Sequence, residues 1–380
     1  MSENNLNIQM VDLKSQYMKI KPQVDQAIND VLSSTQFING EHVKSFQNEL
    51  AAYLDVKHVI TCANGTDALQ ISMMALGLKP GDEIITPSFT YIATTEVIGL
   101  LGLKPVFVDC DPENFNISVD EVEKAITKKT KAIVPVHLFG QSSDMKFIMS
   151  LAKKYNLFVI EDNAQAIGSD YLGFNQPQKT GTIGNIGCTS FFPSKNLGCF
   201  GDGGAMMTND DELAKKLRMI ANHGQSKRYY HDIVGCNSRL DNIQAAVLRI
   251  KLKELDQYIL NRQKAANYYD QNLKDLDQLT LPFRNLDSNH VFHQYTLKLD
   301  DSIVRDELIQ YLAEKNIPAM VYYPVPAHRQ KMFSKIPNSY GNMKVTNWLS
   351  SRVFSLPMHT ELSTLQQDYI IENISNFLNK

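Results

Sequence analysis

Seven short runs rich in β-branched and apolar residues constrain the fold of this chain more than any other feature. They are almost continuously apolar rather than alternating, which is typical of strands buried on both faces of a sheet. Helical periods lie between the first five runs, so we expect right-handed crossovers and a mostly parallel sheet covered by helices on both faces. The runs are residues 58–62, 83–86, 105–109, 131–136, 157–161, 187–192 and 205–208.

The pattern changes near residue 240. Residues 240–276 predict a long charged amphipathic helix or a helix pair, followed by shorter mixed segments and a terminal helix from Thr364. The chain has 380 residues, a length that suits two domains. We therefore expect a large α/β domain over residues 20–250 and a smaller α+β domain over residues 251–380, with residues 1–19 packed against the smaller one.

Composition narrows the classes of function. A net charge of −3 gives no bias toward nucleic acid or an anionic membrane. The five cysteines are odd in number and form no C-x-x-C pair, and the nine histidines form no H-E-x-x-H motif, so we expect neither a disulfide framework nor a metal site. His290 and His293 are expected to pack or lie at the surface. No leader or membrane span is visible, which favours a cytoplasmic protein.

Ligands of an open parallel sheet bind beyond the carboxyl ends of its strands, and two short segments stand at such ends. Asn64, Gly65 and Thr66 follow the first run and open a helix, so they could bind a phosphate; the alternative is an ordinary capped turn. Glu161 and Asp162 close the fifth run. Asp162 could face a cationic ligand atom, or it could cap a helix or lie at the surface.

The strongest candidate is Lys195, which follows a buried run and precedes a cluster of glycines. Crowding and burial lower the pKa of an amine and make it more nucleophilic, whereas the alternative is a surface lysine. The glycine cluster is neither G-x-G-x-x-G nor a P-loop, and the chain lacks the G-x-S-x-G of a serine hydrolase. A nucleophilic lysine, a carboxylate for a protonated ring nitrogen and an anion-binding helix start together describe a pyridoxal 5′-phosphate (PLP) site.

Several motifs in a fixed order carry a resemblance that covers nearly the whole chain. They include CANGTDAL, TPSFTYIATT, VIEDNAQAIG, TSFFPSKNLGCFGDGG and CNSRLDNIQAAVL. With these motifs the chain resembles the DegT/DnrJ/EryC1/StrS family of nucleotide-sugar aminotransferases. The resemblance implies the type I PLP-dependent transferase fold, similar to aspartate aminotransferase, with a large seven-stranded mostly parallel sheet and a smaller α+β C-terminal domain. It also implies a homodimer with shared active sites.

The resemblance assigns roles to individual residues. Lys195 would form the Schiff base with PLP, Asp162 would keep the pyridine nitrogen protonated, and Gln165 would touch the ring or its hydroxyl. The remaining cofactor contacts would be Gly65, Thr66 and Ser190 at the phosphate, Tyr91 stacked on the ring, and Asn237 reaching the phosphate from the partner subunit. The family's dehydratase branch has a histidine in place of this lysine, so Lys195 argues against dehydration.

Within the family, HGQ-x-x-RY and G-x-NSRLD-x-x-QAA most resemble enzymes that act on a UDP-linked 3-oxo-2-acetamido uronic acid. Glutamate would donate the amino group to the C3 ketone, forming a 2,3-diamino sugar for surface polysaccharide such as O-antigen. Arg239 would meet the uronate carboxylate and Tyr323 would also contact the substrate. Relatives often have His-Tyr-Pro where this chain has Tyr322-Tyr323-Pro324, so no sugar contact is assigned to Tyr322.

Two alternatives stay open at this point. The first is the same chemistry at C3 or C4 of a dTDP-linked keto-6-deoxyhexose, because arginine is common at the position of Arg239 in the family. The second is a catalytically inactive protein with the fold of PLP-dependent enzymes that serves as a scaffold or regulator. The presence of the lysine and the aspartate argues against it.

Overall fold

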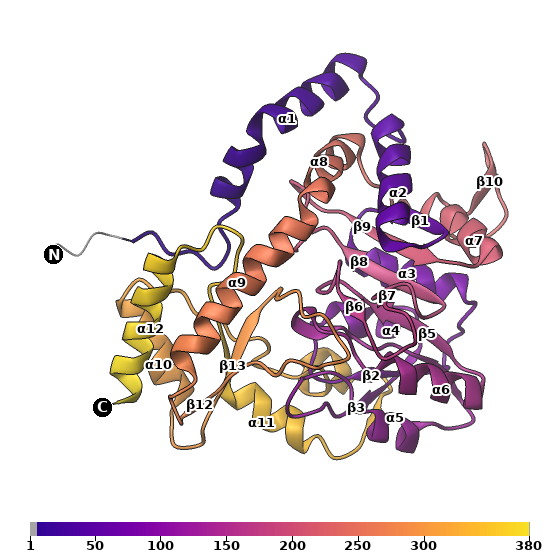
Figure 1. The fold of residues 1–380 in the computed structure, drawn as a ribbon. Coiled ribbons are helices and arrows are strands. Elements are labelled where there is room, and N and C mark those ends of the chain that lie inside the picture. Colours follow the sequence, from indigo (N-terminus) through magenta and orange to yellow (C-terminus); the bar gives the residue numbers. More distant parts are fainter. Residues whose placement is uncertain (1–5, 380) are drawn as a thin grey trace.

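A computed structural model describes residues 6–379. Its centre is an eight-stranded sheet in the order β1-β9-β8-β5-β4-β2-β3-β14, and only β9 runs antiparallel to its neighbours (Figure 1). The strands are β1 (His58–Cys62), β2 (Glu83–Pro87), β3 (Lys104–Val108), β4 (Thr130–Ile133), β5 (Phe158–Asp162), β8 (Ile186–Ser190), β9 (Gly204–Thr208) and β14 (Ser339–Tyr340). All seven predicted runs therefore form strands of one mostly parallel sheet.

Two differences from the expected sheet have local causes. β4 ends at Ile133 rather than Val136, because Pro135 has no N–H for the ladder, and pairing resumes only in an isolated bridge between Val136 and Asp162. The sheet has eight strands rather than seven, since the two-residue β14 joins β3 from the last third of the chain. So short a strand carries no recognisable period in the sequence.

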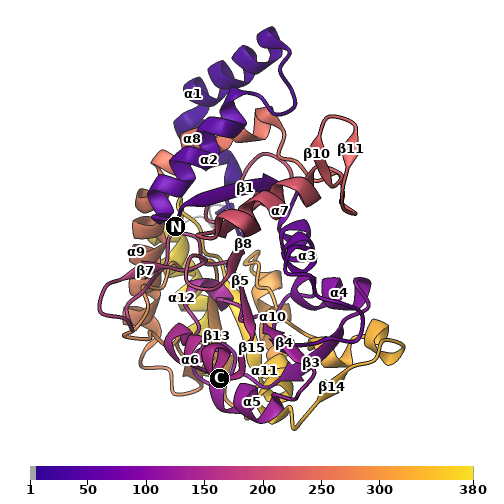
Figure 2. The ribbon, with the colours of Figure 1, turned by 90° about the vertical axis from the view of Figure 1, so that its right-hand side faces the viewer.

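Helices cover both faces of the sheet, as the continuous apolar runs predict (Figure 2). Neighbouring residues of one strand pack on opposite faces of the sheet. In β1, the side chain of Ile60 packs against the helices of one face, here called the first group, and that of Val59 packs against the helices of the other face, the second group. The first group is α3 (Gly65–Ala75), α4 (Ala93–Leu100) and α7 (Asp211–Ala221). The second group is α2 (Glu41–Leu54), α5 (Val119–Ala125), α6 (Met145–Tyr155) and α8 (Asn242–Lys253).

The C-terminal part forms a second core around a three-stranded antiparallel sheet, β12-β13-β15. Its elements are α9 (Leu255–Leu273), β12 (Leu279–Thr280), β13 (Tyr295–Leu299), α10 (Arg305–Glu314), β15 (Val353–Leu356) and α12 (Thr364–Leu378). The predicted long helix is a pair, α8 and α9, that breaks at Glu254. Ile8 packs into this second core. The domain boundary at residue 250 and the placement of residues 1–19 stay predictions, and residues 1–5 lie outside the described part.

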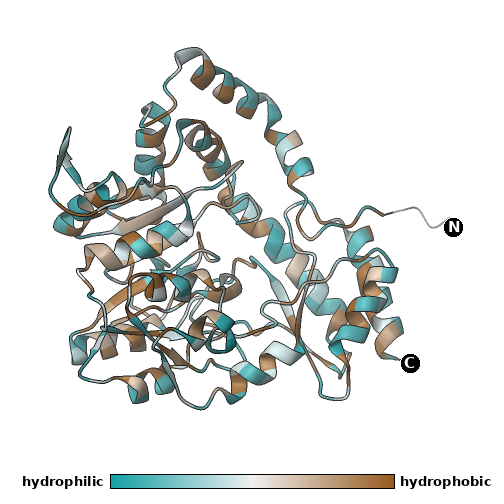
Figure 3. Ribbon diagram, turned by 180° about the vertical axis from the view of Figure 1, so that it is seen from behind, coloured by the Kyte–Doolittle hydropathy of each residue, from teal (hydrophilic) through white to brown (hydrophobic). Residues whose placement is uncertain are grey.

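Short elements complete the fold. Residues 225–231 form the hairpin β10–β11, which projects from the body of the molecule (Figure 2). Along the outer helices, apolar and polar residues alternate as in amphipathic helices (Figure 3). The remaining elements are α1 (Leu13–Ser34), β6 (Asp170–Tyr171), β7 (Gln178–Lys179), β10 (Gln225–Lys227), β11 (Tyr230–His231), α11 (Lys344–Arg352) and the 3-10 turns Leu138–Gly140, Ala327–Arg329 and Lys331–Ser334.

All five cysteines are free thiols. Within residues 6–379 no group of three or more acidic, histidine or cysteine side chains is arranged to hold a metal ion. Among the described helices, none is both long and apolar enough to cross a lipid bilayer.

Candidate active site

The predicted phosphate contacts meet at the carboxyl edge of the large sheet. Cys62 at the end of β1 and Ser190 at the end of β8 both pair with Gly204 of β9. Gly65 then passes so close to Ser190 that a Cβ added to Gly65 would lie 2.7 Å from the Cβ of Ser190. The structure therefore brings Gly65, the neighbouring Thr66 and the hydroxyl of Ser190 together at one end of the sheet.

The helix that begins here is oriented to receive an anion. Asn64 caps α3, and its side-chain oxygen accepts a hydrogen bond of 2.8 Å from the backbone N–H of Asp67. The N–H groups of Gly65 and Thr66, in the first turn, have no intrahelical acceptor. Free N–H groups, the positive end of the helix dipole and a serine hydroxyl suit a phosphate group, so this corner fits the phosphate of PLP.

Gly65→Ala should weaken cofactor binding. The added methyl group would press on the Cβ of Ser190 at 2.7 Å and on its backbone Cα at 3.2 Å, so α3 and β8 must move apart. We expect the dissociation constant for PLP to rise about tenfold or more, measured by absorption titration. Gly341→Ala is the control, because a Cβ there meets nothing within 4 Å. Equal PLP affinity in the two variants would contradict this account of the phosphate corner.

Asp162 is the last residue of β5 and is 5% exposed. Its carboxylate accepts a hydrogen bond of 2.7 Å from the hydroxyl of Thr94 and one of 3.2 Å from the backbone N–H of Ala164. Burial raises the pKa of Asp162, while these two bonds and the charge of Lys195 act against the rise. The sequence did not lead us to Thr94. Its position in the first turn of α4, the helix that follows β2 at the same edge of the sheet, could have indicated it.

Glu161, its neighbour, has a structural role instead. Successive residues of a strand point to opposite faces, and Glu161 is completely buried. Its carboxylate accepts hydrogen bonds from the backbone N–H groups of Gly181, Ile183 and Gly184 at 2.6–2.8 Å, and from Nε2 of His137 at 2.9 Å. Glu161 therefore anchors the segment that leads into β8, and only Asp162 is available to the site.

Lys195 lies in a tight turn after β8. Its backbone N–H donates to the carbonyl of Phe192 at 2.8 Å, and a Cβ on Gly198 would lie 2.4 Å from the carbonyl oxygen of Pro193. Burial lowers the pKa of Lys195 to about 8, although the negative charge of Asp162 acts in the opposite direction. At neutral pH roughly a tenth of such an amine is uncharged, far more than for a lysine in water. The turn thus presents a nucleophilic amine within electrostatic reach of Asp162.

Three further predicted residues are linked beside Asp162. Gln165 donates from Nε2 to the hydroxyl of Tyr323 at 2.9 Å and accepts at Oε1 from the backbone N–H of Phe139 at 2.6 Å. The ring of Tyr323 lies 6.1 Å from that of Tyr91, which is 58% exposed. Burial raises the pKa of Tyr323, so it remains a neutral phenol. Gln165, Tyr91 and Tyr323 therefore form one group at this edge, and their contacts with cofactor and substrate stay predictions.

Asn237 and Arg239 lie on either side of a residue that is bonded to the start of α3. Ser238 donates to Asp67 at 2.6 Å and accepts from the backbone N–H of Ala63 at 3.0 Å. Asn237 is exposed. Arg239 donates to the side chain of Asn222 at 3.3 Å and lines a cavity of about 220 Å³ that Arg218 also lines. The contact of Asn237 with a partner's phosphate stays a prediction.

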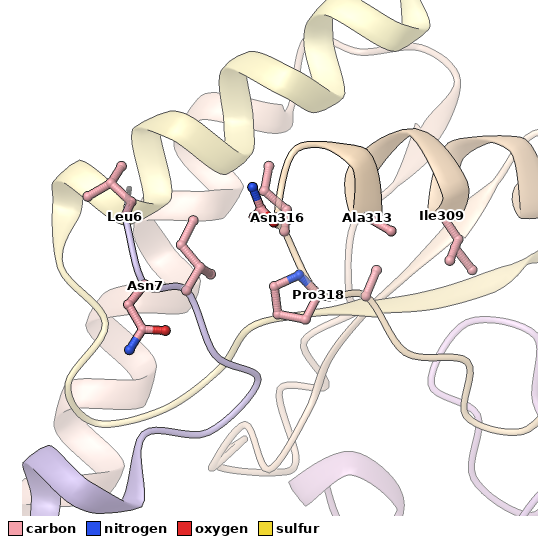
Figure 4. Close-up of a pocket in the computed structure, with 9 residues that line it drawn as sticks. Leu6, Asn7, Ile309, Ala313, Asn316 and Pro318 are labelled. Carbon is pink, nitrogen blue, oxygen red and sulfur yellow. The ribbon is translucent and has the colours of Figure 1, made fainter. Parts of the chain in front are cut away.

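A larger cavity of about 660 Å³ lies in the C-terminal part, between residues 6–8 and the end of α10 (Figure 4). Its lining is Leu6, Asn7, Ile8, Ile309, Ala313, Asn316, Ile317, Pro318 and Ala319. None of these side chains can exchange a proton or act as a nucleophile, so this cavity is not the reaction site.

The fold, the lysine, the buried aspartate and the anion-binding helix start define a PLP-dependent transferase similar to aspartate aminotransferase. The chain belongs to the DegT/DnrJ/EryC1/StrS aminotransferase family, whose sequence model matches residues 18–375. It is therefore an aminotransferase that uses PLP.

Individual relatives cover nearly the whole chain. A pleiotropic regulatory protein of Geobacillus stearothermophilus is 45% identical over 98% of this chain and 99% of its own length. The UDP-2-acetamido-2-deoxy-3-oxo-D-glucuronate aminotransferase of Pseudomonas aeruginosa is 44% identical over 97% and 100%. A dTDP-3-amino-3,6-dideoxy-alpha-D-galactopyranose transaminase of Aneurinibacillus thermoaerophilus is 40% identical over 97% and 99%.

Among solved structures, NtdA of Bacillus subtilis with its bound cofactor PMP is similar with a TM-score of 0.89 and 30% identity. The match covers 100% of this chain and 87% of that one. PMP is the aminated form of PLP, which agrees with an aminotransferase.

Proposed function

We propose that this aminotransferase transfers the amino group of L-glutamate to the C3 ketone of a UDP-linked 3-oxo-2-acetamido uronic acid. The 2,3-diamino sugar formed would serve a surface polysaccharide such as O-antigen. The observation that carries the chemistry is the position of a partly buried Lys195 within electrostatic reach of the buried Asp162 at a strand end, beside a helix start suited to phosphate. The similarity to the Pseudomonas aeruginosa enzyme supports the substrate.

Each of these residues has a defined task in the proposed reaction. PLP, when bound, supplies an aldehyde that reacts with amines and a ring that accepts the electron pair of a carbanion. Asp162 holds the proton on the ring nitrogen and so keeps the ring cationic. Lys195, once its amine is free, takes the proton from the α-carbon of glutamate and later gives a proton back. The proposed kinetic pattern is ping-pong, with 2-oxoglutarate leaving before the sugar binds.

Arg239→Ala should selectively impair use of the uronate. A bidentate contact between guanidinium and carboxylate contributes on the order of 1.5–3 kcal/mol, so its loss should lower kcat/KM roughly ten- to a hundredfold. Arg239→Lys should recover only part, because an ammonium cannot form the same paired hydrogen bonds. The measurement compares the uronate with its C6-hydroxymethyl counterpart in wild type and variants. If Arg239→Ala weakens both substrates equally, Arg239 does not bind the carboxylate.

The second candidate is amination at C3 or C4 of a dTDP-linked keto-6-deoxyhexose. A dTDP-sugar transaminase is 40% identical to this chain, against 44% for the UDP-uronate enzyme, so the alternative is not favoured over the first candidate. Such a sugar has no C6 carboxylate for Arg239. Faster turnover of the dTDP-linked ketone by the wild-type enzyme would establish this candidate instead.

We also propose that the active enzyme is a homodimer in the cytoplasm whose two sites each take Asn237 from the partner subunit. Two observations support the homodimer. Asn237 is exposed, and so are the apolar side chains just before it, since Ile233 is 40% and Val234 83% exposed. Five free thiols and a nucleotide-linked substrate suit a reducing compartment.

Mixing two inactive variants tests the shared site. Asn237→Asp should repel the phosphate and Lys195→Ala should remove the amine, so each homodimer should be nearly inactive. After subunit exchange, a mixed dimer has one site with an intact lysine and an intact asparagine from its partner, and about a quarter of wild-type activity should return. No recovery after proven exchange would place Asn237 in its own subunit's site and contradict the shared arrangement.

A further inference from the structure

The contact between Thr94 and Asp162 joins two elements that are distant in the sequence. Thr94 is the second residue of α4, which follows β2, whereas Asp162 ends β5, and β4 lies between these two strands in the sheet. The hydroxyl of Thr94 donates to Oδ2 of Asp162 at 2.7 Å, a short distance that is typical of a hydrogen bond to a charged oxygen. Thr94 is 1% exposed, so this bond is shielded from solvent.

The backbone of Asp162 is fixed on both sides. Its N–H donates to the carbonyl of Pro135 at 2.9 Å, and its own carbonyl accepts from the N–H of His137 at 3.0 Å. On the other side β5 pairs with β8, and the next N–H, that of Asn163, donates to the carbonyl of Cys188 at 2.7 Å. The remaining freedom of Asp162 is the rotation of its side chain, so the direction of its carboxylate depends on the hydrogen bonds of its two oxygens.

Two hydroxyl groups in sequence support one of these oxygens. Oδ1 accepts the longer bond from the N–H of Ala164, at 3.2 Å, whereas Oδ2 accepts the bond from Thr94. The hydroxyl oxygen of Thr94 lies 3.2 Å from that of Thr90, which is 4% exposed. An ionised carboxylate can only accept, so Thr94 donates to Asp162 and Thr90 donates to Thr94. The hydrogen bonds therefore run in one direction, from Thr90 through Thr94 to Asp162, and each strengthens the next.

This pair of hydroxyls opposes the effect of burial on Asp162. Burial raises the pKa of Asp162, and the bond from Thr94 is the largest of the effects that lower it again. The other titratable groups whose charge interacts with Asp162 are Lys195, His137, Tyr323 and Cys188. An aspartate that takes up a proton of its own loses the negative charge that holds a proton on a ring nitrogen. Keeping Asp162 ionised is therefore a requirement of its proposed task.

We propose that Thr94 is a positioning residue for Asp162: supported by Thr90, its hydroxyl keeps the buried carboxylate ionised and directs it toward the ring nitrogen of PLP. Tyr91, which is predicted to stack on the ring, belongs to the same short segment. Residues 90–94 would thus support the cofactor both at the face of its ring and through the partner of its nitrogen. This inference rests on the proposed role of Asp162.

Thr94→Val is the principal variant, because valine has nearly the shape of threonine but no hydroxyl. Oδ2 of Asp162 would lose its donor, and the protonated acid would become more favourable. We expect the single-turnover rate at saturating L-glutamate and neutral pH to fall about tenfold or more, with little change in the half-saturating glutamate concentration. Thr94→Ser keeps the hydroxyl and should retain most of the wild-type rate. Thr90→Val leaves the bond to Asp162 in place and should cause a smaller loss.

The ring nitrogen provides a readout that a purely structural role of Thr94 would not change. PLP labelled at this nitrogen with an NMR-active isotope shows, when bound to the full-length chain, whether the nitrogen carries a proton. We expect a protonated ring in the wild type and in Thr94→Ser, and a shift toward the unprotonated value in Thr94→Val. Thr95→Val is the matched control and should behave as the wild type, because Thr95 is 0% exposed and its hydroxyl donates to the carbonyl of Ile92 at 3.0 Å.

Three results would overturn the inference: a ring as fully protonated in Thr94→Val as in the wild type, an equal change in Thr95→Val, or a Thr94→Ser variant as impaired as Thr94→Val. In each of these cases the ring should still be unprotonated in Asp162→Asn. A protonated ring in Asp162→Asn would instead overturn the role of Asp162 itself, so the two failures are distinguishable. If Thr94→Val does not fold, Thr94→Ala replaces it in every comparison.

Discussion

Lys195→Ala is expected to abolish turnover. The variant loses the amine that bonds the cofactor and the group that moves the proton at the α-carbon, and no other described lysine has its charge facing Asp162. We expect kcat to fall by about 10⁴-fold or more, measured with L-glutamate and the keto-sugar by release of 2-oxoglutarate. The variant should still fold, since the side chain of Lys195 forms no hydrogen bond or ion pair with any residue in the described part of the chain.

Lys251→Met is the matched control for this variant. Lys251 is buried, and burial lowers its pKa to about 8 as it does for Lys195, but its amine donates to the carbonyl of Gly198 at 2.6 Å and so stabilises the same turn. Its loss should reduce stability more than the chemistry of the remaining folded enzyme. Substantial turnover by Lys195→Ala would disprove the assignment of the whole site.

Asp162→Asn should lower kcat by roughly a hundredfold or more while the protein stays folded. The amide is nearly isosteric and can still accept from Thr94, but it has no negative charge to hold a proton on the ring nitrogen. The electron-accepting ring therefore loses its cationic form. The single-turnover rate with L-glutamate, followed by cofactor absorption, measures this step directly.

Asp109→Asn separates this effect from the cost of altering a buried aspartate. Asp109 is 6% exposed, follows β3 and accepts hydrogen bonds from the backbone N–H groups of Val345 and Thr346. Its substitution should lower thermal stability and leave the single-turnover rate near that of wild type. An unchanged rate in Asp162→Asn would mean that another group contacts the ring nitrogen.

The large sheet could be predicted from the sequence because its strands are buried on both faces, and such strands are continuously apolar. β14 could not be predicted, since Ser339 and Tyr340 form a strand only because the chain returns to β3 from the last third of the sequence. The break between α8 and α9 could not be predicted either, because the hydrophobic pattern of residues 240–276 allowed one helix or two.

The features of the candidate site also divide into those that the sequence predicts and those that it does not. Gly65, Asp162, Ser190 and Lys195 all lie close to the carboxyl end of an apolar run, so their position at one edge of the sheet follows from strand direction alone. Contacts across long sequence separations left no such signal. Examples are the hydrogen bond of Thr94 to Asp162 and the approach of residues 290–294 to the turn of Lys195. Similarly, the sequence showed two acids at the end of β5, but only the packing of His137 and residues 181–184 distinguishes the structural Glu161 from Asp162.

Amination of a panel of nucleotide-linked keto-sugars by the purified enzyme tests the central claim most directly. The panel pairs UDP-linked 3-oxo-2-acetamido uronic acid with its C6-hydroxymethyl counterpart and with dTDP-linked 3-oxo and 4-oxo-6-deoxyhexoses, each with L-glutamate as donor. We predict that 2-oxoglutarate and an amino sugar form in equal amounts, with the highest kcat/KM on the UDP-linked uronate. Preferred turnover of a dTDP-linked sugar would contradict the proposed substrate, and no amination of any ketone by PLP-loaded enzyme would contradict the proposed function as a whole.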